Sequence, residues 1–142
     1  MALHRFIENR SKGARNMPEK DQRHQLGKDS EQLAVDYLQK LGYTIIQRNY
    51  RIRGGEIDII AKENKTLVFI EVKSRTTTRY GHAVQSLTRQ QQKRLSKAAL
   101  TYLHQHKLNN QSARFDLIAI QKNQCTGTEI RLIRNAFELI AF

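Results

Sequence analysis

Two acidic residues and one lysine interrupt stretches of the sequence that are otherwise apolar and β-branched. Asp58 stands among isoleucines in the segment 56–60, and Glu71 and Lys73 stand near the end of the apolar segment 67–73. Carboxylate oxygens are the ligands that Mg²⁺ and Mn²⁺ prefer, and a nearby ammonium group can hold a phosphate oxygen or a water molecule. These residue types therefore suit metal-assisted hydrolysis of a phosphodiester.

The spacing of these residues determines whether their side chains can meet. Successive side chains of a strand point to opposite faces, so Glu71 and Lys73 share a face if residues 66–75 form a strand. If residues 64–65 form a two-residue hairpin loop, the register places Asp58 directly opposite Glu71, with Cβ atoms about 5 Å apart. A slip of one residue would put the two carboxylates on opposite faces.

Two carboxylates at such a distance repel each other, and in a partly desolvated setting one of them has to take up a proton. A divalent cation between them removes this conflict. The alternative is that Glu71 and Lys73 form an ordinary solvated ion pair, because Glu-x-Lys spacing is common in sequences. Glu31 raises a similar choice: it lies beside the apolar stripe of a predicted helix, where it could bind the cation or pair with an arginine.

The charge of the chain favours a polyanionic partner. The net charge is +12 over 142 residues, and residues 1–24 account for only +3 of it. Between Glu71 and Asp116 there are nine Lys or Arg residues and no acidic residue. A surface of one sign attracts nucleic acid or an anionic membrane, although a high isoelectric point also serves general solubility. The candidates for contact with nucleic acid are Arg51, Arg53, Arg75, Arg79, Arg89, Gln92 and Lys93.

The composition is that of one globular domain. Hydrophobic residues make up 39% of the chain and charged residues 27%, and the length suffices for a single core. The longest uncharged apolar run, 67–70, is too short to span a membrane, and no apolar signal segment follows the first basic residues. A single cysteine, Cys125, excludes an internal disulfide. We therefore expect a cytoplasmic protein without a membrane partner.

The elements that position the three charged residues follow from the apolar periodicity. Residues 1–23 lack such periodicity and are predicted to be a mobile basic arm, which leaves residues 24–142 as the folded domain. Apolar residues at three- and four-residue spacing predict helices, and β-branched or aromatic segments between turn residues predict strands. The predicted helices span about residues 25–41 and 88–106, and the predicted strands span 43–50, 56–62, 66–75, 114–121 and 129–134.

The resulting order, α-β-β-β-α-β-β, predicts an α/β fold with a mixed central sheet flanked by helices. Gly42 is placed to end the first helix, and Thr88 with Gln91 has the spacing of a capping box at the start of the second. The apolar end of the chain is expected to pack on the sheet or to form a contact surface. It contains Phe137, Leu139, Ile140 and Phe142.

Several segments, taken in order, resemble the YraN-like family of bacterial proteins, which are usually described as endonuclease-like. They are Gly27-x-x-x-Glu31-x-x-Ala34, the segment 54–60 (Gly-Gly-Glu-Ile-Asp-Ile-Ile), the segment 68–75, Arg114-Phe115-Asp116 and the segment 133–137. The resemblance covers about residues 27–137. It implies a restriction-endonuclease-like fold close to that of archaeal Holliday-junction resolvases.

The same resemblance implies a role for individual residues. Asp58 and Glu71 would bind Mg²⁺ or Mn²⁺, Glu31 would complete the metal site, and Lys73 would act with the two acids in catalysis. The family usually has a lysine before a glutamine where this chain has Gln91, so a cation is missing at that point. Asp116 matches a family motif, and a structural role is expected for it.

Fold alone does not establish an activity, so three functions stay open. The first is a metal-dependent endonuclease for branched or single-stranded DNA, with DNA favoured over RNA. The second is a nucleic-acid-binding protein that keeps the nuclease fold without turnover. The third is an interaction protein whose basic face meets an acidic partner. A resolvase-like task would need two active sites about a two-fold axis, and thus a homodimer.

Overall fold

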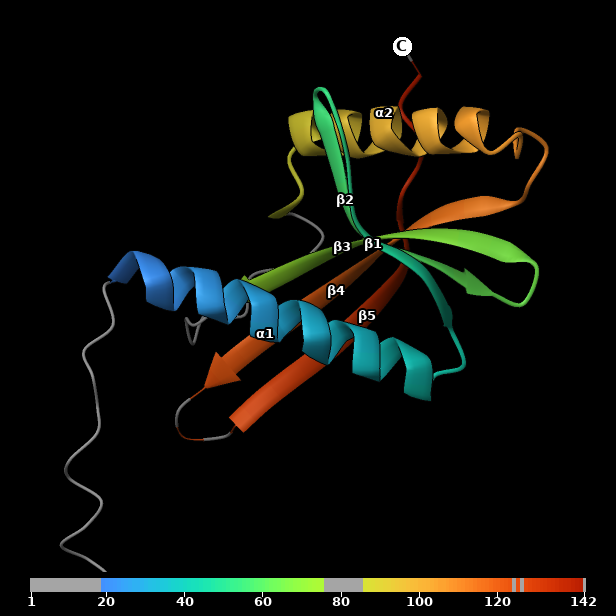
Figure 1. Cartoon of the computed structure of the whole chain (residues 1–142). Coiled ribbons are helices and arrows are strands. Elements are labelled where there is room, and N and C mark those ends of the chain that lie inside the picture. Colours follow the sequence, from blue (N-terminus) through green and yellow to red (C-terminus); the bar gives the residue numbers. More distant parts are fainter. Residues whose placement is uncertain (1–18, 76–85, 124, 126, 142) are drawn as a thin grey trace, which may run out of the picture.

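A five-stranded sheet with one helix on each face makes up the part of the chain that the computed structural model describes, residues 19–75, 86–123, 125 and 127–141 (Figure 1). The two helices are α1 (Glu19–Lys40) and α2 (Arg89–Gln105). The strands, which lie side by side in chain order, are β1 (Thr44–Ile52), β2 (Gly55–Glu63), β3 (Thr66–Arg75), β4 (Ala113–Asn123) and β5 (Gly127–Phe137). The predicted α/β fold and its order of elements are confirmed.

The sheet is mixed. β1, β2 and β3 pair antiparallel, and so do β4 and β5. β3 and β4 are parallel, so the chain has to cross from one end of the sheet to the other between them, and α2 is part of this connection. The crossover places α2 directly above the strands that carry the three charged residues of interest.

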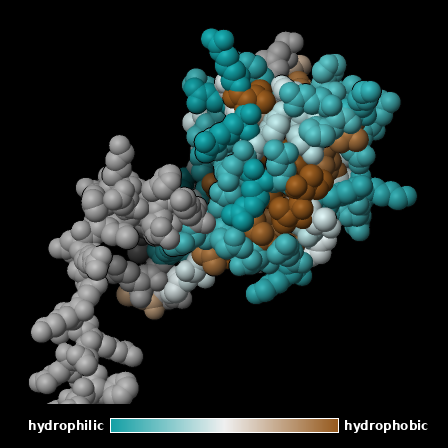
Figure 2. All heavy atoms as spheres, in the orientation of Figure 1, coloured by the Kyte–Doolittle hydropathy of each residue, from teal (hydrophilic) through white to brown (hydrophobic). Residues whose placement is uncertain are grey.

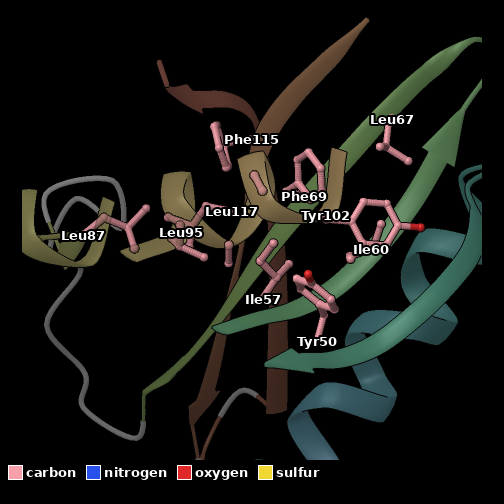
Figure 3. Packing of buried hydrophobic residues seen from close by; sticks show 12 residues of the cluster. Tyr50, Ile57, Ile60, Leu67, Phe69, Leu87, Leu95, Tyr102, Phe115 and Leu117 are labelled. Atoms are coloured by element: carbon pink, nitrogen blue, oxygen red, sulfur yellow. The ribbon is translucent and has the colours of Figure 1, made fainter. Parts of the chain in front are cut away.

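Two layers of core residues hold the helices on the sheet. Neighbouring residues of β2 serve opposite layers, because Ile59 packs toward α1 and Ile60 toward α2, as strand alternation requires. Burial on both faces explains why β3 begins with an uninterrupted apolar run. In the α2 layer, Tyr102 contacts Phe69 and Tyr50 edge to face, with ring centroids 5.9 and 5.3 Å apart (Figure 3).

The predicted bounds of the helices and strands agree closely with the structure, except at the start of α1. α1 begins at Glu19, about two turns before the predicted start, and so includes residues 19–23. These residues favour helix by propensity but add no apolar period, which is why the pattern does not show them. Thr88 caps α2 and forms the predicted capping box with Gln91. Residues 1–18 of the predicted arm lie outside the described part of the chain.

Specific contacts hold the end of α1 and the end of β5 in place. Gly42 ends α1 with φ +94°, and the amide of Tyr43 donates to the carbonyl of Leu38. Phe137, the last residue of β5, stacks on Phe115 with centroids 4.4 Å apart and so packs on the sheet as expected. Leu139 is exposed, and Phe142 lies outside the described residues. Most of the surface in the view of Figure 2 is hydrophilic. No described helix is long and apolar enough to cross a bilayer.

Candidate active site between β2, β3 and α2

The hairpin of β2 and β3 has the register that the sequence predicts. Glu63 pairs with Thr66 across a two-residue loop, and the ladder continues to Ile59 paired with Ile70. Asn64 supplies the positive φ of the turn, +54°, a conformation that asparagine tolerates better than most residues. Asp58 is the next residue on β2 beyond this ladder.

The ladder ends where the acidic residues begin. Beyond Ile59 and Ile70 the two strands no longer pair, and the amide of Val72 donates a hydrogen bond to Oδ2 of Asp58 at 2.8 Å. The carboxyl groups of Asp58 and Glu71 lie close enough for each to shift the pKa of the other. A side chain therefore takes the place of backbone pairing at this point of the hairpin.

β1 is distorted at the same level. Asn49 lies between the pairs Arg48–Ile59 and Tyr50–Ile57, and so stands next to Asp58 across the sheet. Its φ is +53°, which is rare within a strand and bends β1. The sequence gives little sign of this kink, because asparagine is also common in ordinary turns and loops.

Electrostatics at the acidic pair are unfavourable for two negative charges. The pKa of Glu71 is raised to about 8, mainly by burial and next by the neighbouring charge of Asp58, whose effect outweighs the lowering by Lys73. Burial also raises the pKa of Asp58, against the effect of the Val72 amide. The ammonium of Lys73 lies 3.8 Å from Oε1 of Glu71. Near neutral pH the pair therefore holds a proton, as expected for two carboxylates without a cation.

A cavity of about 180 Å³ opens beside the pair. Three acidic side chains of the sheet and three residues of α2 line it: Glu56, Asp58, Glu71, Gln91, Arg94 and Leu95. This volume is large enough for a hydrated ion or a phosphate group. No sequence pattern assigns Glu56 or Arg94 to the site, because their meeting depends on how α2 docks on the sheet.

Comparison with known sequences gives the family. The sequence model of a family described as "Uncharacterised protein family UPF0102" matches residues 30–120. The chain belongs to the UPF0102 family. The YraN-like family that its motifs resemble is the same family, and the matched residues include Glu31, Asp58, Glu71 and Lys73.

Curated relatives of this UPF0102 protein match over most of its length. A UPF0102 protein of Geobacter sulfurreducens is 48% identical over 114 residues, which are 80% of this chain and 89% of the relative. The UPF0102 protein of Syntrophus aciditrophicus is 46% identical over 80% of this chain and 88% of its own. That of Caldicellulosiruptor saccharolyticus is 39% identical over 81% of this chain and 98% of its own.

Glu31 of this UPF0102 protein has partners other than the acidic pair. Its carboxylate accepts hydrogen bonds from Nε of Arg48 at 3.1 Å and from Nδ2 of Asn49 at 2.9 Å. It does not line the cavity. Among the described residues, no group of three or more His, Cys, Asp or Glu side chains is arranged to hold a metal ion. A metal role for Glu31 therefore stays a prediction.

Most candidate nucleic-acid contacts of the UPF0102 protein are accessible. Exposed side chains include Arg51, Arg53, Arg75, Arg89 and Lys93. Arg51 forms an ion pair with Glu56 at 3.1 Å. The side-chain Nε2 of Gln92 donates a hydrogen bond to the carbonyl of Leu87 at 3.0 Å, so this side chain helps to hold the start of α2. Arg79 lies outside the described residues.

Asp116 belongs to a polar network that joins four parts of the fold. Its carboxylate is 1% exposed and accepts hydrogen bonds at about 3.0 Å from three donors. They are the side chains of Tyr43 and Arg114 and the backbone amide of Asn135. Arg114 also pairs with Glu63. These contacts connect the end of α1 with β2, β4 and β5 and give Asp116 the structural role expected for it.

Proposed function

We propose that this UPF0102 protein is a metal-dependent endonuclease that hydrolyses phosphodiester bonds in branched or single-stranded DNA. The observation that carries the proposal is that Asp58 and Glu71, two neighbouring half-buried carboxyl groups, line one cavity in a strongly basic protein. Two neighbouring carboxyl groups that are withdrawn from water destabilise a sheet, and groups with such shifted pKa values are concentrated at functional sites.

The residues present fit a divalent cation. Both groups are carboxylates, the donors that Mg²⁺ and Mn²⁺ prefer, and a cation between them would relieve the repulsion that helps to raise the pKa of Glu71. Asp58 and Glu71 would hold the ion, and Glu31 would join them only by leaving Arg48 and Asn49. When bound, such an ion polarises the phosphate and lowers the pKa of a water molecule.

The chain's own groups have separate tasks in this proposal. The amide of Val72 fixes the orientation of the Asp58 carboxylate. Lys73, 3.8 Å from Glu71, offers an ammonium group that binds a phosphate oxygen and stabilises negative charge as the bond breaks.

The test is cleavage of branched, flapped and single-stranded DNA with Mg²⁺ or Mn²⁺. Asp58→Ala should abolish cleavage, and Lys73→Ala should lower kcat by about a hundredfold or more. Asp36→Ala is the matched control, because Asp36 is an exposed carboxylate of α1 that accepts a hydrogen bond from the side chain of Gln32. Equal cleavage by wild type and Asp58→Ala would show a contaminating nuclease. Absence of cleavage by the wild type on every substrate would contradict the proposal.

A second candidate is a nucleic-acid-binding protein without turnover. It is favoured by the charge of +12 and by the finding that no three His, Cys, Asp or Glu side chains of the described residues are arranged to hold a metal ion. Its affinity for DNA should fall steeply with salt, because phosphate contacts dominate. DNA affinity that neither metal nor Glu71→Ala changes, in a protein without nuclease activity, would favour this candidate.

A further inference from the structure

The position of α2 over the acidic pair depends on one close backbone contact. β1 and β2 are joined by a turn of Arg53 and Gly54, and β2 begins at Gly55. A Cβ atom at Gly55 would lie 2.6 Å from the carbonyl oxygen of Arg94 and 3.1 Å from Cβ of Ala98. Only a glycine allows this approach. The contact sets the second and third turns of α2 directly against the start of β2.

The rotation of α2 then fixes where its charged residues lie. Leu95, Ala98 and Tyr102 are buried against the sheet, so residues next to this stripe lie at its edges. Arg94 precedes Leu95, and Gln91 lies three residues earlier on the same side. Both line the cavity of the acidic pair.

Arg94 is the one basic side chain among the described residues that line this cavity. Three carboxylates share the cavity with it, yet no ion pair within 4.0 Å joins Arg94 to any described acidic residue. Glu56 is paired with Arg51 instead, and Glu71 with Lys73. Arg94 is thus exposed and lines the cavity of the acidic pair without forming an ion pair there.

We propose that Arg94 binds the phosphodiester that is placed against the acidic pair, and that the nucleic-acid backbone continues from there past Lys97 and Arg53. The proposal rests on the nuclease function and names the residue that holds its substrate. A guanidinium presents a planar pair of donors that matches two phosphate oxygens. Lys97 extends the path, because its Nζ lies 3.2 Å from where a Cβ of Gly54 would be.

The charged residues along this path are all basic except Glu56, which is paired with Arg51. α2 carries Arg89, Lys93, Arg94 and Lys97 and no acidic residue, and the turn beside it adds Arg53. A cavity of about 180 Å³ admits a phosphate group but not a base pair, so bases stay outside while the backbone enters. Arg94 therefore acts on the phosphate and reads no sequence.

The experiment compares Arg94→Ala, Arg94→Lys and, as the control, Lys40→Ala. Lys40 is exposed at the end of α1, on the other face of the sheet, and its replacement also removes one positive charge. Affinity is measured with a labelled single-stranded oligonucleotide and its duplex, with chelator and with Ca²⁺. Cleavage with Mn²⁺ and Mn²⁺ affinity are measured in parallel.

Arg94→Ala should weaken oligonucleotide binding about tenfold or more, as loss of a charged hydrogen-bond donor does. kcat/KM should fall further, while Mn²⁺ affinity and the unfolding midpoint stay at wild-type values because the side chain is exposed. Arg94→Lys should recover part of the binding, since it keeps the charge but not the paired donors. Lys40→Ala should bind and cleave like the wild type.

Binding by Arg94→Ala equal to that of Lys40→Ala would overturn the assignment, even if the wild type is an active nuclease. Lost binding together with a lowered unfolding midpoint in Arg94→Ala, and again in Arg94→Lys, would show a structural role and would also overturn it. A wild type that binds DNA without cutting it removes the proposed function but leaves the binding comparison decisive for Arg94.

Discussion

The backbone amide of Val72 donates a hydrogen bond to the carboxylate of Asp58, 2.8 Å away on the neighbouring strand. Val72 lies between Glu71 and Lys73, so this bond holds Asp58 against the part of β3 that carries both residues. The ladder between the strands has already ended at Ile59 and Ile70. Changes at Asp58 should therefore affect the pairing of the hairpin as well as its charge.

The stability of the metal-free protein should fall as pH rises from about 4.5 to about 8. The pKa of Glu71 is raised from 4.5 to about 8 in the folded state, so the folded protein binds this proton more tightly than the unfolded chain does. The stabilisation is complete below the unfolded pKa and is lost as pH rises through the folded pKa. Denaturant unfolding with a chelator present, repeated across this range, measures the effect.

Glu71→Gln is the control for this pH dependence. It removes the titrating group and keeps the shape of the side chain, so the decline between pH 4.5 and about 8 should largely disappear. The variant should be at least as stable as the wild type at the upper end of the range. A wild-type protein whose stability rises over the same interval would contradict the raised pKa.

Mn²⁺ should stabilise the wild type, and more strongly at pH 8 than at pH 5, because the cation must displace the proton of the pair. At a concentration a hundred times its Kd, the gain would be about 2.7 kcal/mol. Thermal unfolding with and without Mn²⁺ measures it. Asp58→Asn should lose most of this gain, and an equal gain in the variant would place the cation elsewhere.

Gly55→Ala should both destabilise the fold and impair the site. The added Cβ would meet the Arg94 carbonyl at 2.6 Å, and relieving the clash should cost about 1–3 kcal/mol. The hairpin and α2 would move apart, so DNA binding should weaken too. Gly42→Ala is the comparison: its φ is +94° but no atom lies within 4 Å, so it should lower stability by about 1 kcal/mol and leave DNA binding unchanged.

Asp116→Ala should be among the most destabilising changes in the chain. It removes the buried acceptor that Arg114, Tyr43 and the amide of Asn135 share, and breaking such a buried pair costs about 3–5 kcal/mol. Asp116→Asn keeps an acceptor oxygen and should cost less. Urea unfolding gives both values, and cleavage per folded molecule should be unchanged if the network serves only the fold.

The sequence was sufficient for the centre of the site because its determinants are local. A two-residue loop and the alternation of side chains place Asp58 next to Glu71, whatever the rest of the chain does. The same applies to Thr88 and Gln91 at the start of α2. α1 shows the limit of periodicity, since its first turns from Glu19 have no apolar stripe to reveal them.

The rest of the site depends on contacts between distant parts of the chain. Arg94 reaches the cavity because α2 rests on Gly55, about forty residues earlier. The adjacent glycines at 54 and 55 were the available signal, since a glycine within a strand often marks a close backbone approach. Pairing of Glu31 with an arginine was one of its two expected roles and is confirmed, but nothing in the spacing shows that the partner is Arg48 of β1.

The short loop between β2 and β3 also has a kinetic consequence. Asp58 and Glu71 belong to one hairpin closed by a two-residue turn, so their meeting costs little chain entropy compared with the later addition of β4 beyond α2. The repulsion between them is thus present as soon as the hairpin closes. Acidity and divalent cations should therefore influence how fast this chain folds, and not only how stable it is once folded.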